Sequence, residues 1–227
     1  MIQKVFHALM KRWGNSSLKR FVWNSEYRIG KWNYLRAKPT RPIADRDIVL
    51  PILEIYSKDG DILDLGCGNG TTGFEIACTS YRQYVGVDIS AVAVGEAIVS
   101  AQRDPTRAGK NRYVADDIST FIPDQRFSVV LFRECIYYFS RSTIIRILSR
   151  YSSFLTSNGV FIVRLHDREK YKGIVALIER NYEVIERRSP AQNRAIVMVF
   201  PPAEHNKKLS INLATVIRSP TDKGGRG

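Results

Sequence analysis

The chain has 227 residues, of which 44% are hydrophobic, so it can bury one good core but not two large ones. Three scattered cysteines argue against a disulfide framework or a cysteine metal cluster, and no apolar run approaches the length of a membrane-spanning helix. The N-terminus also lacks the apolar core of a signal peptide, so we expect a cytoplasmic protein.

The formal net charge of +13 is concentrated near the two ends of the chain. Such a basic surface attracts nucleic acid, anionic lipid or a phosphorylated substrate, or serves only to keep a protein in solution. Because no recognised RNA-binding motif occurs, we favour the solubilising role and keep nucleic acid as the weaker alternative. The sequence leaves the oligomeric state open.

Residues 1–47 are predicted to form a basic, aromatic N-terminal cap. Residues 1–13 have the pattern of a short amphipathic helix, which docks on its own domain or lies on a membrane surface. The aromatic-rich stretch 21–34 has no clean period and predicts loop with a short helix. Residues 43–57 predict a helix that is kinked or restarted at Pro51.

Strands and helices alternate over residues 48–202, which we expect to form the main domain. The expected strands are one that leads into Gly66, then 84–87, one that begins at Tyr113, and 127–132, 160–165, 182–186 and 194–200. The expected helices are 71–78, 91–101, 141–155 and 171–180, with Ser90 and Ser140 as N-caps. The order predicts an α/β fold with a Rossmann-like, seven-stranded, mostly parallel sheet, helices on both faces and an antiparallel final strand. Residues 203–227 predict a polar, disordered tail.

A glycine-rich turn follows the first predicted strand, with Gly66, Gly68 and Gly70 at alternate positions. Glycine suits such a turn because no Cβ fits where the chain bends tightly against a ligand. Asp88 ends the next strand, where a carboxylate can accept both hydroxyls of a ribose. Asp64 lies two residues before the first glycine and would repel a pyrophosphate, but it suits a cationic ligand. The pattern therefore predicts a nucleoside cofactor that carries positive charge.

This acid and glycine spacing resembles the first motif of the class I S-adenosylmethionine-dependent methyltransferases, and the resemblance extends over residues 23–200. It implies that S-adenosylmethionine is the cofactor, with the glycines under its methionine part and Asp88 on its ribose. Ile89 would pack on the adenine, Asp116 or else Asp117 would accept the adenine amine, and the Arg133 backbone would meet the amino group. The implied cofactor-binding set is Asp64, Gly66, Cys67, Gly68, Asp88, Ile89, Asp116, Asp117 and Arg133.

Two residues at the strand ends are candidates for a proton acceptor, Glu134 after the fourth strand and His166 after the fifth. The run from Glu134 to Tyr138 resembles the Glu-x-x-Tyr-Tyr run of sugar-directed and nodulation-type N-methyltransferases. Residues 23–35 resemble a segment that caps the cofactor pocket in small-molecule and sugar-directed members, although these aromatics can also be a simple lid on the sheet edge. The candidate acceptor-binding residues are Tyr27, Trp32, Tyr137, Tyr138 and Arg164.

The resemblance implies methyl transfer to the oxygen or nitrogen of a small molecule, with a sugar as one candidate. No motif that grips a flipped base, no cysteine pair suited to attacking a pyrimidine and no metal-ligand spacing occurs. We keep two alternatives: an RNA or protein methyltransferase that uses the basic ends, and a noncatalytic, cofactor-binding partner subunit.

Overall fold

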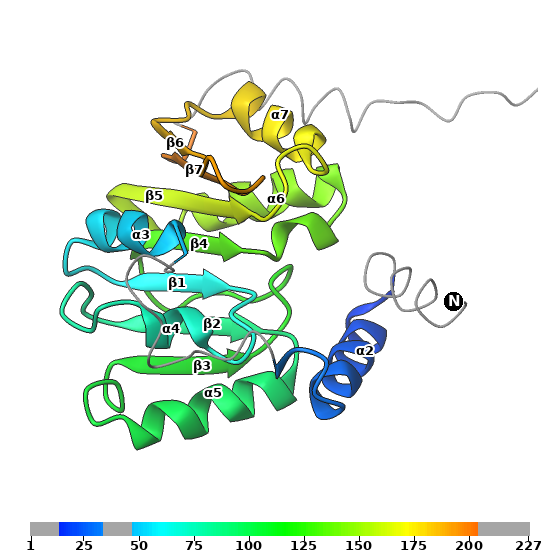
Figure 1. Cartoon of the computed structure of the whole chain (residues 1–227), viewed down its shortest axis with the longest axis vertical. Helices are drawn as coiled ribbons and strands as arrows, with labels where there is room; N and C mark the ends of the chain where they lie inside the picture. The colour runs from blue at the N-terminus through cyan, green and yellow to red at the C-terminus, as the bar shows by residue number, and fades with distance from the viewer. Residues whose placement is uncertain (1–13, 34–46, 204–227) are drawn as a thin grey trace, which may run out of the picture.

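The computed structural model describes residues 14–33 and 47–203. Its centre is a seven-stranded sheet in the order β3-β2-β1-β4-β5-β7-β6 (Figure 1). The first five strands pair in parallel, whereas β7 pairs antiparallel with both β5 and β6. The strands are β1 Ile62–Leu65, β2 Tyr84–Asp88, β3 Asn111–Ala115, β4 Phe127–Arg133, β5 Leu155–Leu165, β6 Glu186–Arg188 and β7 Ile196–Phe200. This is the Rossmann-like sheet that the sequence predicts.

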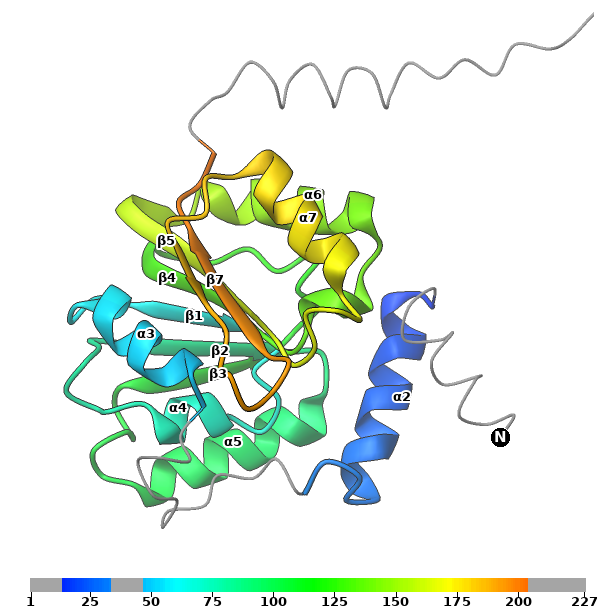
Figure 2. The same cartoon turned by 45° about the horizontal axis from the view of Figure 1, so that its top comes forward.

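Helices cover both faces of the sheet, and one further helix lies at its end. The helices are α2 Ser16–Arg28, α3 Val49–Ser57, α4 Thr71–Glu75, α5 Ala91–Arg103, α6 Arg141–Ser152 and α7 Lys172–Asn181, with a short 3₁₀ helix, η3, at Ile136–Tyr138. Apolar side chains of α6 and α7 pack in one core cluster, and those of α3 and α5 in the other. In Figures 1 and 2, α2 lies beyond the arrowheads of the parallel strands, at their carboxyl ends.

Alternation along the strands decides which side chains share a face. In β1, Leu63 and Leu65 enter the core under α6 and α7, whereas Ile62 enters the core under α3 and α5. Asp64 therefore shares a face with Ile62. The same period places Arg133 on the face of Leu131, and Arg164 on the face of Ile162. All three charged residues thus lie on the α3 and α5 side of the sheet.

The helix in the aromatic-rich stretch is longer than predicted: residues 16–28 form the continuous helix α2, and turns follow at residues 29–33. The Asn15 side chain accepts a hydrogen bond from the Leu18 backbone N–H and caps the helix. The buried residues Val22 and Glu26 are four apart, and this spacing marks one helical face. Because one of these buried residues is a glutamate, the buried face of α2 shows no apolar periodicity in the sequence.

Several further boundaries differ from the prediction. The sixth strand, expected at 182–186, is Glu186–Arg188. Helix α3 begins at Val49, so Pro51 falls in its first turn, where a missing N–H is tolerated and no kink is needed. Helix α4 ends at Glu75 instead of continuing to residue 78. Leu155 belongs to β5, where it pairs with Phe127, and not to the preceding helix. The predictions for residues 1–13, 34–46 and 204–227 lie outside the described residues.

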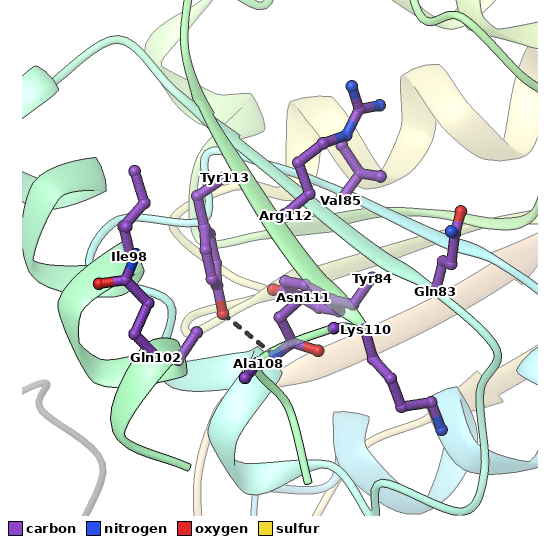
Figure 3. A pocket seen from close by; sticks show the side chains of 12 residues that line it. Gln83, Tyr84, Val85, Ile98, Gln102, Ala108, Lys110, Asn111, Arg112 and Tyr113 are labelled. Atoms are coloured by element: carbon purple, nitrogen blue, oxygen red, sulfur yellow. Dashed lines mark hydrogen bonds between the residues drawn. The ribbon is translucent and has the colours of Figure 1, made fainter. Parts of the chain in front are cut away.

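The amino ends of β2 and β3 line a cavity of about 410 Å³ (Figure 3). Helix α2 lies at the opposite, carboxyl ends of these strands (Figures 1 and 2). Several polar side chains of the cavity already have partners: Arg112 pairs with Asp124, and Asn111 donates to the Tyr113 hydroxyl. Lys110 donates to the Cys78 carbonyl. In parallel α/β sheets ligands bind at the carboxyl ends of strands, so we look for the site at the opposite edge. None of the described helices is long and apolar enough to cross a bilayer.

Candidate active site

The turn between β1 and α4 has three glycines with positive φ: 82° at Gly66, 55° at Gly68 and 80° at Gly70. A Cβ on Gly66 would lie 2.5 Å from the Cβ of Cys135, and one on Gly68 would lie 2.6 Å from the hydroxyl oxygen of Tyr27. Both the backbone conformation and the surrounding contacts therefore require glycine. The result is a bare stretch of backbone at the carboxyl end of β1.

Asp64 is fully buried below this turn. Its Oδ2 accepts a hydrogen bond from the Tyr84 hydroxyl, while its Oδ1 has no hydrogen-bond partner among the described residues. Burial raises the pKa of this carboxyl to about 6. An incompletely satisfied carboxylate under the turn favours a cation above it over a phosphate.

Asp88, at the end of β2, holds the glycine turn to the start of α5. Its Oδ2 accepts from the Gly68 N–H at 2.9 Å, and its Oδ1 accepts from the Ser90 N–H at 2.8 Å. Burial raises the pKa of the Asp88 carboxyl. The next residue, Ile89, is half-buried at the same edge. Cys67, within the turn, is buried, and burial raises the pKa of its thiol.

The two predicted acids after β3 have different surroundings. The Asp116 backbone N–H donates to the Asp88 carbonyl at 3.0 Å, which joins the ends of β2 and β3. Asp117 is buried, and its carboxylate accepts from the Ser16 hydroxyl at 2.6 Å and from Ser119. The Asp117 side chain therefore anchors α2, and Asp116 is the acid of the two that is more available to a ligand.

Helix α2 crosses the ends of several strands. Besides the Ser16 contact, its Asn24 Oδ1 accepts from the Ser90 hydroxyl at 2.9 Å. Tyr27 lies against Gly68, and burial raises the pKa of its phenol. The Trp32 indole donates to Glu26 at 3.1 Å. The structure thus places the predicted acceptor residue Tyr27 directly on the glycine turn and Trp32 just beyond the end of α2.

Glu134, immediately after β4, joins three predicted site residues. Its Oε2 accepts from the Tyr137 hydroxyl at 3.0 Å and contacts His166 Nδ1, while its Oε1 is paired with Arg164. Glu134 has a φ of 62°, a conformation that costs a residue with a Cβ about 1–2 kcal/mol. Strain of this kind persists where surrounding contacts impose it, and it clusters at functional sites.

Aromatic rings surround this group. Tyr137 stacks on Tyr171 with centroids 4.4 Å apart and lies edge-on to His166 at 5.6 Å. Tyr138 meets Trp23 of α2 edge-on at 5.0 Å. The predicted residues at the ends of β4 and β5 are therefore brought together, and the rings continue from them to the cap.

Asp47 is a member of the site that the sequence did not indicate. It is 11% exposed and pairs with Arg133 at 3.2 Å and Arg164 at 3.0 Å. Arg133 also pairs with Glu75 at 3.0 Å. The only local signal is that an aspartate two residues before Val49 can cap a helix, which says nothing of the two arginines.

The donor set suits a cationic nucleoside cofactor. The glycine turn gives access to backbone, Asp64 supplies buried negative charge, and the carboxyls of Asp88 and Asp116 lie on neighbouring strand ends. Among residues 14–33 and 47–203 no three His, Cys, Asp or Glu side chains gather in a way that could hold a metal ion. The three cysteines are free thiols.

Comparison with known proteins agrees with this description. Residues 62–159 match the family model described as a methyltransferase domain. A search of the curated proteins found no significant match to the chain.

Many solved structures share the fold. N-methyltransferase NodS from Bradyrhizobium japonicum WM9, bound to S-adenosyl-L-homocysteine, has 16% sequence identity and a TM-score of 0.59 over 80% of this chain and 100% of NodS. Magnesium protoporphyrin IX methyltransferase (ChlM) from Synechocystis PCC 6803, with bound S-adenosylmethionine, has 14% identity and a TM-score of 0.61 over 82% of this chain and 96% of ChlM. The CcbJ methyltransferase from Streptomyces caelestis has 15% identity and a TM-score of 0.58 over 69% of this chain and 88% of CcbJ.

The matched domain, the sheet order and the glycine turn all indicate a methyltransferase, and the cofactor is S-adenosylmethionine. Residues 62–159 are a methyltransferase domain, and the described part of the chain has the fold of the class I S-adenosylmethionine-dependent methyltransferases.

Proposed function

We propose that the chain methylates a nitrogen or oxygen of a small molecule, with a sugar-type acceptor as the leading candidate. The observation that carries the proposal is the contact between Glu134 Oε2 and His166 Nδ1 at the carboxyl ends of β4 and β5. When bound, the cofactor supplies an electrophilic methyl group on a sulfonium. The chain must then place the acceptor and take its proton.

An ionised carboxylate only accepts hydrogen bonds, so Glu134 requires the proton of a neutral His166 to be on Nδ1. The other ring nitrogen, Nε2, is then a lone-pair base. No described residue hydrogen-bonds to Nε2, and the His166 side chain is 46% exposed. Tyr137 donates to the same Glu134 oxygen and helps to fix its direction. We assign His166 Nε2 as the proton acceptor, with Glu134 as its orienting partner.

For the cofactor we assign the turn of Asp64, Gly66, Cys67 and Gly68 to the methionine part and Asp88 to the ribose. The adenine falls to Ile89 and Asp116, since Asp117 is engaged with Ser16. The Arg133 backbone is assigned to the amino group, because the Arg133 side chain is occupied by Glu75 and Asp47.

Residues 14–33 are the described part of a cap that we propose over the cofactor. Helix α2 is tied to the ends of β2 and β3 through Asn24 and Ser16, and such a cover favours a small acceptor over a polymer. The rings of Tyr137, Tyr138 and Trp32, with Arg164 beside them, are the proposed acceptor surface. Flat aromatic faces suit the apolar faces of sugar rings.

The test uses S-adenosylmethionine with a labelled methyl group and a panel of amines, alcohols and amino sugars, with total RNA and protein included. We expect label on a small acceptor and a loss of about 10²- to 10⁴-fold in His166→Asn and Glu134→Gln. A thermal shift with S-adenosylhomocysteine should stay as in the wild type, because neither side chain is assigned to the cofactor.

Two outcomes would contradict the proposal. Label on RNA alone, with binding that weakens steeply as salt rises, would favour the nucleic-acid alternative. Full activity in both variants, with an unchanged pH profile, would remove the assigned proton acceptor.

A further inference from the structure

We infer that Asp47 is a positioning residue for the Glu134–His166 pair, and this inference rests on the proposed function. Asp47 lies outside every motif discussed above, directly before α3. Its carboxylate is the link between two arginines that the sheet places side by side.

The register of the sheet creates the need for such a link. Arg133 and Arg164 are direct partners across the parallel pair β4–β5, and they point to the same face. Both side chains are only 16% exposed, so water screens their repulsion poorly. Glu75 also pairs with Arg133 and Glu134 with Arg164, but only an anion that contacts both guanidinium groups can hold them together.

Asp47 meets this requirement with both of its oxygens. Its Oδ2 is 3.0 Å from Nη2 of Arg164 and 3.2 Å from Nη2 of Arg133, and its Oδ1 accepts from Arg164 Nε at 3.3 Å. Although burial opposes it, the charges of Arg133 and Arg164 hold the pKa of Asp47 below its ordinary value. The Asp47 carboxylate is therefore ionised in its two-arginine setting.

Asp47 acts on the assigned base, His166, through Arg164. Arg164 contacts Asp47 on one side and Oε1 of Glu134 on the other, which leaves Oε2 for His166 Nδ1. If Asp47 lost its charge, Arg164 would move away from Arg133 and take both oxygens of Glu134. His166 would then lose the partner that holds the proton on Nδ1.

Asp47→Asn removes the charge with little change of shape. Asn also keeps the hydrogen bond that Asp47 Oδ1 accepts from the Val49 N–H at 3.1 Å, so the start of α3 stays capped. The matched control is Asp61→Asn, another buried aspartate in an arginine pair, with Arg82, at the amino end of β1.

The readout is the tautomer of His166, measured on the full chain by long-range ¹H–¹⁵N NMR of the imidazole ring with S-adenosylhomocysteine bound. We expect the Nδ1-protonated tautomer in the wild type and in Asp61→Asn, and its loss in Asp47→Asn. A second variant, Asp47→Asn with Arg133→Gln, keeps the charges balanced so that the fold is retained. It should keep the tautomer, because without the charge of Arg133 nothing repels Arg164 toward both oxygens of Glu134.

The possible failures are separable. A wild-type His166 without the Nδ1 proton would overturn the assigned proton acceptor and with it the proposed function. A wild-type tautomer that survives in Asp47→Asn, or one that is lost in the double variant as well, would overturn the role of Asp47 alone. The measurement needs no methyl acceptor, so it does not depend on which molecule is methylated.

Discussion

Replacing Asp64 with asparagine should change how the stability of the protein depends on pH. The pKa of Asp64 rises from 3.8 to about 6, and burial is the largest cause. Between these two values the unfolded chain loses a proton that the folded chain keeps. Stability from this group is therefore fully present below pH 3.8 and is lost as pH rises through about 6.

The shift of about two pKa units corresponds to about 3 kcal/mol of unfolding free energy. About 2 kcal/mol of this should be lost between pH 4.5 and pH 7.5. Asparagine does not titrate, so the difference in stability between Asp64→Asn and the wild type should move by that amount in favour of the variant. Any fixed cost of placing an amide at this site cancels in the comparison.

The assay is urea denaturation of both proteins at pH values across this range, without cofactor. Tyr84→Phe supplies a second arm, because the Tyr84 hydroxyl donates to Asp64 and lowers the Asp64 pKa. Its removal should widen the pH window in which stability is lost. Curves for Asp64→Asn and the wild type that run parallel from pH 4.5 to pH 7.5 would refute the reasoning.

Three more predictions concern other parts of the structure and are tested by urea denaturation. Gly66→Ala should lower the free energy of unfolding by more than about 2 kcal/mol, since the new Cβ would meet Cys135. Gly95→Ala, which has open space around it in α5, should raise it by about 0.5–1 kcal/mol. Equal effects of the two substitutions would contradict this reasoning. Arg107→Met should lower the free energy of unfolding by more than about 3 kcal/mol, because Arg107 is buried and donates to three backbone carbonyls in and just after α4. A loss smaller than about 1 kcal/mol would show that water satisfies these carbonyls instead. Glu134→Gly should be more stable than Glu134→Ala by about 1 kcal/mol, because only glycine relieves the positive φ, and the reverse order would exclude strain there.

The cofactor side of the site could be predicted because its signals are local. A glycine turn, an acid two residues before it and an acid at the next strand end depend on backbone geometry within a few residues of each other. Parallel pairing then brings Asp88 beside Ala115, so that Asp116 follows at the same edge. The one choice that the sequence left open, Asp116 or Asp117, depended on Ser16, about a hundred positions away.

The length of helix α2 could not be predicted, for a different reason. Its inner face carries Glu26, which is 1% exposed and forms an ion pair with Lys31 at 2.7 Å. Pattern analysis treats a glutamate as a solvent-facing residue, since unpaired burial of its charge would be costly. The partner that makes burial tolerable lies beyond the end of the helix, so the helical period is visible only once the pairing is known.

The ends of β4 and β5 show most clearly what a single sequence leaves out. Glu134 and His166 could be predicted from their positions after strands, but Asp47 had no distinguishing neighbour in the chain. Its importance comes from the register that sets Arg133 opposite Arg164, and register is a property of the folded sheet. Two buried arginines side by side are unfavourable unless an anion joins them. The fold keeps this arrangement, with a strained Glu134 beside it, at a cost in stability. Charge held in place in this way is what the proposed proton-accepting pair requires.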